Sequence, residues 1–370
     1  MTDFYLNYPT DKLVVNKTHS ILSNSNSLSF HHSLDCYKES PLINLENLSN
    51  KLNISKLCVK DESKRFDLNA FKVLGASYAV FETLKKYPNT SVFCTATDGN
   101  HGKAVAWSSR RYGKKTIVYV PNDTSSLRIE AIETFGATVH QLDLNYEQTC
   151  NYASKMSKKM NWQLIQDTSW ENYEEIPSLI MAGYLTHFIE IDKFLEIKNL
   201  SNFDIIFLQC GVGSWAASCI WYHLNKYGKN RPKIVIVEPN ESCGVFQSFK
   251  DNNRVSPIGS LNTIMAGLNC GIPSKNAWEI IKNGCDAVVK ISDEEVKSSM
   301  KVFYNPIKND SKIISGESGA AGLAGLLKTK KASHLQALRD HIKLTDSSKI
   351  LLFNTEGDTD VNSFQEIIKN

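Results

Sequence analysis

The amino-acid sequence predicts an α/β protein with parallel sheets and two domains. Apolar runs of strand length alternate with helix-length segments, which is the pattern of parallel strands joined by crossover helices. The runs are apolar throughout, as expected for strands that are buried on both faces. With 370 residues, the chain is also longer than one hydrophobic core usually supports, so two domains are expected.

The expected elements begin after a polar N-terminal region. The Ser/Asn-rich stretch 20–33 predicts a loop or an extended arm, and a helix-like segment begins at Pro41. From there strands and helices alternate. Strands are expected at 56–60, 91–96, 115–121, 137–142, 204–210, 233–239, 287–292 and 349–353, and a short apolar run lies at 162–165. Helices are expected at 69–86, 100–112, 125–135 and 145–160, with another between the strands 204–210 and 233–239.

Composition and charge exclude several classes of protein. The net charge is only +3 and no basic patch is interleaved with aromatic residues, so nucleic acid is not an expected partner. No apolar run approaches the roughly 20 residues of a membrane span, and the N-terminus lacks the basic and apolar regions of a secretory signal. Nine cysteines without a CxxC pair indicate mostly reduced thiols. We therefore expect a cytoplasmic protein.

Asp98 occupies an unusual position in the turn TDGNHG, directly after a predicted strand. A glycine-containing turn at a strand-to-helix junction usually binds an anion through free backbone N–H groups, and a carboxylate repels an anion. Asp98 therefore either caps the following helix or takes part in the chemistry of a site. Asp167 follows the apolar run 162–165 and presents the same choice, because it either begins a turn with Thr168 and Ser169 or belongs to a site.

A second junction, CGVGSWAAS, is suited to a phosphate group. Gly211 and Gly213 follow the strand 204–210, and Ser214 opens a helix whose dipole favours an anion. The alternatives are a tight turn without a ligand and a dinucleotide fold. A dinucleotide fold has an acidic residue where Glu238 stands, but it needs a third glycine where the sequence has Ala216.

Two further features carry chemistry. Lys72 lies at a helix start among apolar neighbours, where a lysine either extends its amine to solvent or is desolvated with a lowered pKa. A desolvated lysine forms Schiff bases with carbonyl compounds. The loop NTEGDTD, 354–360, places hydroxyls and carboxylates at the end of a strand, where they can hold a ring nitrogen or an amine.

Together these parts resemble an enzyme that uses pyridoxal 5'-phosphate (PLP), with a lysine for the aldehyde and a glycine-rich turn for the phosphate. The chain resembles the fold-type II (tryptophan synthase β-like) PLP family and, within it, the diaminopropionate ammonia-lyases. The resemblance runs from about Pro41 to Asp360. The motifs that carry it are KDESKRFDLNAFKVLG, TDGNHG, QDTSWENYEEIP, LQCGVGSWA, TIMAGLNCG, IISGESGAAGL and NTEGDTD.

The resemblance implies a role for each matching residue. Lys72 matches the Schiff-base lysine, and Asp98 and Asp167 match catalytic carboxylates. The cofactor-binding residues it implies are Gly211, Val212, Gly213 and Ser214 at the phosphate, Asn100 at the ring hydroxyl and Thr355 near the ring nitrogen. The residues it implies in the loop around the substrate carboxylate are Thr97, Asp98, Gly99 and His101. No metal site is implied.

The resemblance also implies the fold and assembly. We expect two open, twisted, mainly parallel sheets flanked by helices, with a smaller domain, 76–187, inserted in a larger one formed by 1–75 and 188–370. A homodimer is expected. Cys243 and Cys270 fall where the family has cysteines, so they either form a disulfide or remain buried free thiols.

The implied activity is β-elimination from 2,3-diaminopropionate, a small amino acid, to give pyruvate and two ammonia. Asp167 would remove the α-proton of the L form and Asp98 that of the D form. Asp98 would also attract the second ammonium group of the substrate. The alternatives are a serine/threonine dehydratase, a PLP-binding protein without catalytic activity, and a nicotinamide dehydrogenase; the missing third glycine argues against the last.

Overall fold

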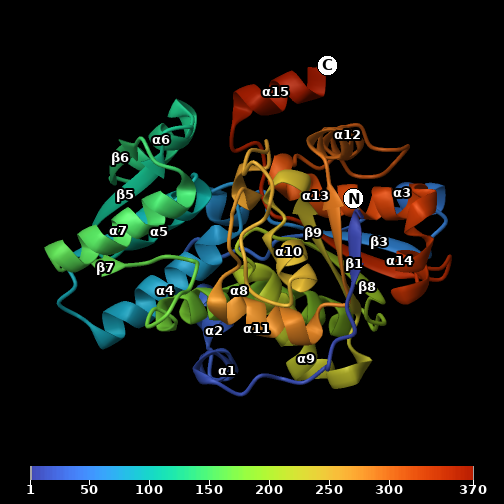
Figure 1. The fold of residues 1–370 in the computed structure, drawn as a ribbon, viewed down its shortest axis with the longest axis horizontal. Helices are drawn as coiled ribbons and strands as arrows, with labels where there is room; N and C mark the ends of the chain where they lie inside the picture. Colours follow the sequence, from blue (N-terminus) through green and yellow to red (C-terminus); the bar gives the residue numbers. More distant parts are fainter. Residues whose placement is uncertain (1, 370) are drawn as a thin grey trace.

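A computed structural model describes residues 2–369, which form two sheets with helices around each (Figure 1). The larger sheet has seven strands. Their order is β1 (Phe4–Leu6), β10 (Ala287–Ile291), β9 (Lys233–Pro239), β8 (Ile205–Gln209), β11 (Lys349–Asn354), β3 (Lys56–Asp61) and β2 (Leu42–Asn44). The two edge strands are antiparallel to their neighbours and all inner pairs are parallel. The predicted fold class is therefore confirmed.

The smaller sheet has four parallel strands and lies beside the larger one (Figure 1). Their order is β6 (Thr138–Leu142), β5 (Lys115–Pro121), β4 (Val92–Ala96) and β7 (Gln163–Leu164). All four strands lie inside the range 76–187 that we assign to the inserted domain. The exact division of the chain at 76 and 187 stays a prediction, since both positions fall inside long helices.

Helices connect the strands and cover the sheets. Those associated with the smaller sheet are α5 (Asn100–Arg110), α6 (Ser126–Glu133) and α7 (Tyr146–Met160). The others are α1 (Lys17–Ser23), α2 (Ser27–His32), α3 (Glu46–Lys51), α4 (Lys72–Lys86), α8 (Glu175–Ile197), α9 (Ser214–Tyr227), α10 (Gly244–Lys250), α11 (Lys275–Gly284), α12 (Asp293–Tyr304), α13 (Glu317–Lys331), α14 (Gln336–His341) and α15 (Val361–Lys369). Among residues 2–369, no helix is long and apolar enough to cross a membrane.

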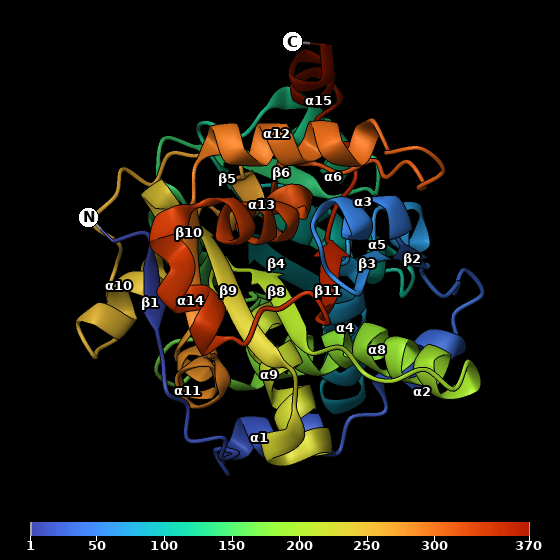
Figure 2. The ribbon, with the colours of Figure 1, turned by 90° about the vertical axis from the view of Figure 1, so that its right-hand side faces the viewer.

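The larger sheet is buried on both faces, which explains why its strands are continuously apolar. Successive residues of a strand point to opposite sides. In β8, Ile206 and Leu208 join a core with α4, α8, α9 and α11, whereas Ile205 and Phe207 join a second core with α12, α13 and α14 (Figure 2). The sheet is therefore the central layer between two layers of helices.

The N-terminal region differs from its prediction. The stretch 20–33 is not a loop, because most of it lies in α1 and α2, whose Leu22 and Phe30 are buried. The segment after Pro41 is the strand β2 followed by α3, not a helix from the start. Both helices and the strand depend on contacts with distant parts of the chain, which local sequence does not reveal.

Helix α4 begins three residues later than predicted. Phe66, Asp67 and Asn69 have positive φ angles between 50° and 58°, so the chain before Lys72 is a tight irregular turn. A 3-10 turn, η1 (Arg65–Asp67), lies in this segment. Lys72 is the first residue of α4, in agreement with its expected position at a helix start.

Candidate active site

One pocket receives residues from the carboxyl ends of strands in both sheets. Its lining includes every residue predicted for catalysis, cofactor binding or substrate binding, from Lys72 and the 97–101 turn to Asp167, the 211–214 turn and Thr355. The carboxyl ends of parallel strands are the usual position of ligand sites in such sheets. The predicted residues are thus brought together, although they are spread over nearly 300 positions of the chain.

Lys72 and Asp167 form an ion pair in the pocket. Lys72 Nζ lies 2.5 Å from Asp167 Oδ2. Burial disfavours the charge on both groups, but the attraction between them is stronger. The pKa of Lys72 is consequently raised, so the lowered pKa considered for a desolvated Lys72 is wrong, and the pKa of Asp167 is lowered to about 2. Asp167 is therefore ionised at neutral pH and reaches the amine directly, so it is more than the start of a turn.

Asp98 has a different environment. Its side chain does not cap α5, whose N-cap residue is Gly99, so the helix-cap alternative is wrong. Burial raises the pKa of Asp98 to about 8, despite the nearby guanidinium of Arg128. Arg128 Nη1 donates a hydrogen bond to the backbone oxygen of Asp98 at 3.2 Å. The pocket therefore contains two carboxylates whose environments push their pKa values apart, a pattern that assigns acid and base roles in enzymes.

The turn before α9 fits a phosphate group. Gly213 has a φ of +92°, which favours glycine. A Cβ on Gly211 would lie 3.0 Å from the oxygen of Gly267, so a side chain there would narrow the pocket. Within residues 2–369 the backbone N–H groups of Gly211, Gly213 and Ser214 have no acceptor, and they open toward the pocket at a helix N-terminus. The hydroxyl of Ser214 is already used, because it donates to the backbone oxygen of Asp167 at 2.6 Å.

Asn100 and Thr355 are held by partners that the sequence analysis did not select. Asn100 Nδ2 donates to Glu356 Oε2 at 2.5 Å, and Glu356 Oε1 accepts from the backbone of Ser318 at 3.0 Å. Thr355 Oγ1 accepts from Gln209 Nε2 at 3.0 Å. Glu356 lies within the NTEGDTD motif and Gln209 directly before the CGVG turn, so the motifs contained a signal for both.

Thr97 and His101 shape the loop that contains Asp98. Thr97 Oγ1 accepts from the backbone N–H groups of Gly99 and Gly102 at 2.9 and 3.1 Å. His101 Nε2 donates to the backbone oxygen of Ile165 at 2.8 Å, since a carbonyl oxygen only accepts. Burial lowers the pKa of His101, so the ring is neutral and Nδ1 keeps its lone pair. The substrate contacts of Thr97, Gly99 and His101 stay a prediction.

Tyr146 and Arg128 also line the pocket and were missed. Tyr146 is the first residue of α7, and its oxygen accepts from Gln166 Nε2 at 3.3 Å. Neither residue belongs to a recognisable local motif. Tyr146 begins α7, which packs on β4, and Arg128 lies in α6, which packs on α5 and β6, so both reach the pocket only through the tertiary structure.

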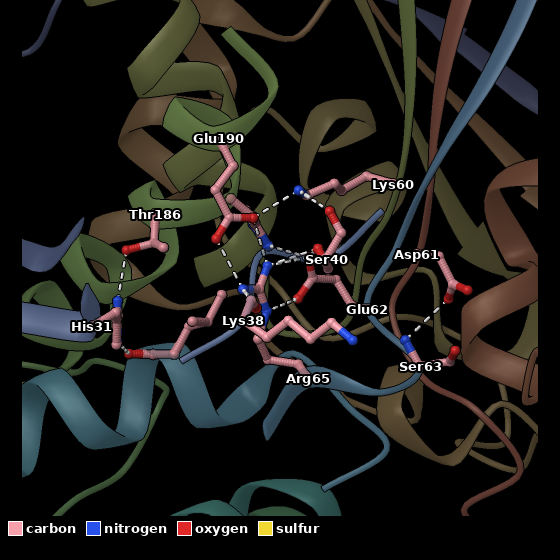
Figure 3. A network of polar contacts seen from close by, with 12 residues as sticks. His31, Lys38, Ser40, Lys60, Asp61, Glu62, Ser63, Arg65, Thr186 and Glu190 are labelled. Atoms are coloured by element: carbon pink, nitrogen blue, oxygen red, sulfur yellow. Dashed lines mark hydrogen bonds and ion pairs between the residues drawn. The ribbon is translucent and has the colours of Figure 1, made fainter. Parts of the chain in front are cut away.

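A buried network of charged groups supports the turn that precedes Lys72 (Figure 3). Arg65 Nε lies 2.7 Å from Glu62 Oε2, and Arg65 Nη2 lies 2.7 Å from Glu190 Oε2. Lys60 Nζ lies 2.6 Å from the same Glu190 oxygen. These groups tie β3, η1 and α8 together, and two cations balance two carboxylates. The network fixes the irregular turn whose end positions Lys72.

Cys243 and Cys270 are both free thiols in the structure, so the alternative without a disulfide is the one observed. Cys270 lines the pocket, and Cys243 donates to the backbone oxygen of Asn240 at 3.3 Å. Burial raises the pKa of both thiols, that of Cys243 to about 11. The thiols are therefore protonated at neutral pH.

The fold and this pocket define a PLP enzyme of fold type II. A family model described as "Pyridoxal-phosphate dependent enzyme" matches residues 34–341, and the chain belongs to this family. PLP is accordingly its cofactor.

Two curated relatives and two solved structures narrow the resemblance. Diaminopropionate ammonia-lyase of Salmonella typhimurium is 38% identical over 93% of this chain and 91% of the relative. The Escherichia coli enzyme of the same name is 35% identical over 92% of this chain and 89% of the relative. Its crystal structure with an aminoacrylate-PLP azomethine reaction intermediate has a TM-score of 0.91 at 33% identity, covering 99% of this chain and 96% of that one. The structure of its complex with D-serine has a TM-score of 0.91 at 32% identity and covers the same shares of the two chains.

Proposed function

We propose that this protein is a lyase that converts 2,3-diaminopropionate and water to pyruvate and two ammonia. The observation that carries the proposal is the pair of carboxylates around one lysine, with Asp167 paired to Lys72 and Asp98 held at a pKa of about 8. The names of the relatives above support the choice of substrate.

The residues divide the work by position. Lys72 holds the cofactor, the Gly211–Ser214 turn binds its phosphate, and Asn100 and Thr355 face its ring. When bound, PLP withdraws electrons from the α-carbon and stores the negative charge left by the α-proton. Asp167 or Asp98 accepts that proton, and the β-amine leaves as ammonia after it gains a proton from Lys72 or a nearby acid. Water then releases the second ammonia and leaves pyruvate.

The two carboxylates would serve opposite enantiomers. The α-protons of D and L substrates point to opposite sides of the cofactor ring, so one base cannot reach both. Asp167, adjacent to Lys72, would take the proton of the L form, and Asp98 that of the D form. The carboxylate of Asp98 would also attract the β-ammonium group, which serine and threonine lack.

A serine/threonine dehydratase is the second candidate, because the same groups can expel a β-hydroxyl. The D-serine complex of the Escherichia coli relative favours testing it. The two activities differ in product ratio, since diaminopropionate gives two ammonia for each pyruvate and serine gives one.

The deciding experiment supplies the purified protein with D- and L-diaminopropionate and with D- and L-serine, and measures pyruvate and ammonia. We expect kcat/KM to be highest for a diaminopropionate enantiomer, with two ammonia per pyruvate. A preference for serine would replace the proposal with the dehydratase function. Absence of turnover with bound PLP would favour the non-catalytic alternative.

The homodimer and the cytoplasmic location are further parts of this proposal and rest on the resemblance. Light scattering of the purified protein should give twice the mass of one chain. Fractionation of the native cells should recover the activity with the cytoplasmic proteins.

A further inference from the structure

Gln209 is a buried residue of the pocket with no assigned role. It is the last residue of β8, and Thr355 directly follows β11, the neighbouring parallel strand (Figure 2). Both residues are almost inaccessible to solvent, at 3% and 4%. Adjacent strand ends therefore place the Gln209 amide against the Thr355 hydroxyl.

The contacts of Gln209 fix the orientation of its amide. Nε2 lies 2.9 Å from the backbone oxygen of Phe353, 3.0 Å from Thr355 Oγ1 and 3.3 Å from the backbone oxygen of Gly319. Carbonyl oxygens only accept hydrogen bonds, so the nitrogen must face them. The opposite orientation would direct the amide oxygen at two carbonyl oxygens and repel both.

This orientation determines the direction of the Thr355 hydrogen bond. An amide nitrogen donates and does not accept. Its two protons are directed at the two shortest contacts, Phe353 O at 2.9 Å and Thr355 Oγ1 at 3.0 Å, and the Gly319 oxygen at 3.3 Å shares one of them, so Thr355 Oγ1 accepts from Gln209. The hydroxyl proton of Thr355 then remains for another acceptor. Within residues 2–369 that hydroxyl has no other hydrogen-bond partner, and Thr355 lines the pocket.

The side chain of Gln209 has one energetically unfavourable feature. Its Oε1 is buried and has no partner among the described residues. A buried polar atom without a partner is costly, and such an atom in a native structure calls for an explanation. Gly322 of α13 packs closely against this oxygen: a Cβ added at Gly322 would lie only 3.2 Å from Gln209 Oε1. An apolar side chain at this position would avoid the cost of the unpartnered oxygen. We therefore attribute the role of Gln209 to the N–H groups of its amide.

We propose that Gln209 is a positioning residue that fixes the Thr355 hydroxyl as a hydrogen-bond donor to the ring nitrogen of the cofactor. A donor at that point stabilises the unprotonated nitrogen, because its lone pair accepts the hydrogen bond. The neutral ring limits how far the charge from the α-carbon spreads, which favours expulsion of the β-amine over transamination. The inference rests on the proposed function, because it assigns Thr355 to the ring nitrogen.

The test compares Gln209→Met with the unaltered holoenzyme, each loaded with PLP labelled with ¹⁵N in the ring. The ¹⁵N chemical shift reports the protonation of that nitrogen directly, without turnover. We expect Gln209→Met to move the signal toward the protonated value, and to raise the number of transamination events per elimination about tenfold or more. Thr355→Ser should keep both readouts near those of the unaltered enzyme, because it retains the hydroxyl. Thr355→Asp supplies the signal of the protonated ring.

Two controls separate positioning from packing. Gln247→Met removes a buried glutamine of α10 that does not line the pocket and whose Nε2 donates to Asp251, and should leave both readouts unchanged. In a Thr355→Val background, Gln209→Met should add nothing to either readout, because the group that it orients is gone. If Gln209→Met lowers only the thermal midpoint and leaves the ¹⁵N signal and the transamination ratio unchanged, Gln209 merely packs the strand ends. Failure of the unaltered protein to bind PLP at Lys72 would instead overturn the proposed function.

Discussion

At the scale of single residues, Asp98 and Asp167 show how environment separates two identical side chains. Asp167 is stabilised as an anion by its ion pair with Lys72, whereas Asp98 is buried without a comparable partner. The first is ionised throughout the physiological range and the second titrates near pH 8. The two proposed bases should therefore differ in both enantiomer preference and pH dependence.

The enantiomer preference is tested by removing each carboxylate separately. Asp98→Asn should reduce kcat/KM for D-diaminopropionate by about 10²-fold or more, the usual effect of losing a general base, and affect the L form less. Asp167→Asn should do the reverse. Steady-state kinetics on both enantiomers measures the split. Equal losses on both substrates from either variant would assign the residue to binding or packing.

The pH dependence follows from the ionisation of Asp98. As a base it acts only when deprotonated, so the D activity that depends on it should rise with pH up to about 8 and then level off. Asp167, with a pKa of about 2, gives no such change for the L form. The ratio of kcat/KM for D to that for L cancels the ionisation of the substrate, which is the same for both enantiomers. Below pH 8 this ratio should fall about tenfold per pH unit; a constant ratio from pH 6 to 9 would contradict the assignment.

Lys72 makes the simplest prediction at this scale. The purified protein should be yellow, and borohydride should fix PLP on Lys72, because reduction of the Schiff base gives a stable secondary amine. Peptide mapping by mass spectrometry locates the adduct, and Lys72→Ala should lose turnover by orders of magnitude. An adduct on another lysine, such as the partly buried Lys103, would end the assignment.

At the scale of elements, the charged network joins β3, η1 and α8 and so fixes their relative positions. Breaking a buried ion pair by removing one partner costs about 3–5 kcal/mol, because a charge is left uncompensated. Glu190→Gln should therefore lower the stability by this amount, measured by urea or thermal unfolding. Glu294→Gln removes an exposed partner of Lys297 and should change the stability by less than about 1 kcal/mol. A small effect of Glu190→Gln would mean that water or rearrangement compensates Arg65 and Lys60.

The same network predicts sensitivity to acid. Burial alone would raise the pKa of Glu62 and Glu190, but Arg65 outweighs burial and holds both below their usual values. A carboxylate whose pKa is lower in the folded state stabilises the fold above its unfolded pKa and loses that contribution as pH falls. The network's contribution should thus decrease as pH falls below about 4.5, and Glu190→Gln should show a smaller decrease.

The loops that contain Cys243 and Cys270 lie side by side. Ser242 Oγ donates to Asn269 Oδ1 at 2.7 Å, and a Cβ on Gly244 would lie 2.2 Å from the oxygen of Gly271. Treatment with a mild oxidant should therefore reduce the number of free thiols from nine to seven and link these two cysteines. Thiol titration of the denatured protein and peptide mapping measure the result. A different pair, or nine thiols after oxidation, would rule out this disulfide.

At the scale of the whole molecule, the sequence predicted the central strands and the site motifs well because each depends on local pattern. The inner strands are long apolar runs, and Asn100 and Thr355 lie within their own motifs. The edge strands β1 and β2 have three residues each and are not fully buried, so they leave no clear pattern. α1 and α2 are polar in sequence and depend on α8, through contacts such as Thr18 with Ser178 and His31 with Thr186.

The residues that were missed in the site share a cause. Tyr146 reaches the pocket from α7, and Glu356 acts through Asn100, more than 250 positions away in the chain. Tyr146 belongs to no local motif, and although Glu356 lies in the NTEGDTD motif, its contact with Asn100 follows only from how the two sheets are placed. The pocket is built from both sheets, so we expect a ligand bound in it to raise the free energy of unfolding of the whole chain.

Cofactor removal tests this last point. A ligand bound only by the folded state stabilises it by RT ln(1 + [L]/Kd), about 2.7 kcal/mol at a hundredfold excess over Kd. Removing PLP with hydroxylamine should lower the thermal midpoint, and adding PLP should restore it. Gly211→Ala should reduce the difference between the two midpoints, because its Cβ would approach the oxygen of Gly267 to 3.0 Å and narrow the phosphate cradle.

The matched control is Gly113→Ala. Gly113 also has a positive φ, +64°, but lies after α5, where an added Cβ meets nothing within 4 Å. Its replacement strains the backbone equally with and without the cofactor, so both midpoints should fall together. If Gly211→Ala behaved in the same way, lowering both midpoints without changing their difference, the 211–214 turn would be a structural turn, and the phosphate would have to be bound elsewhere.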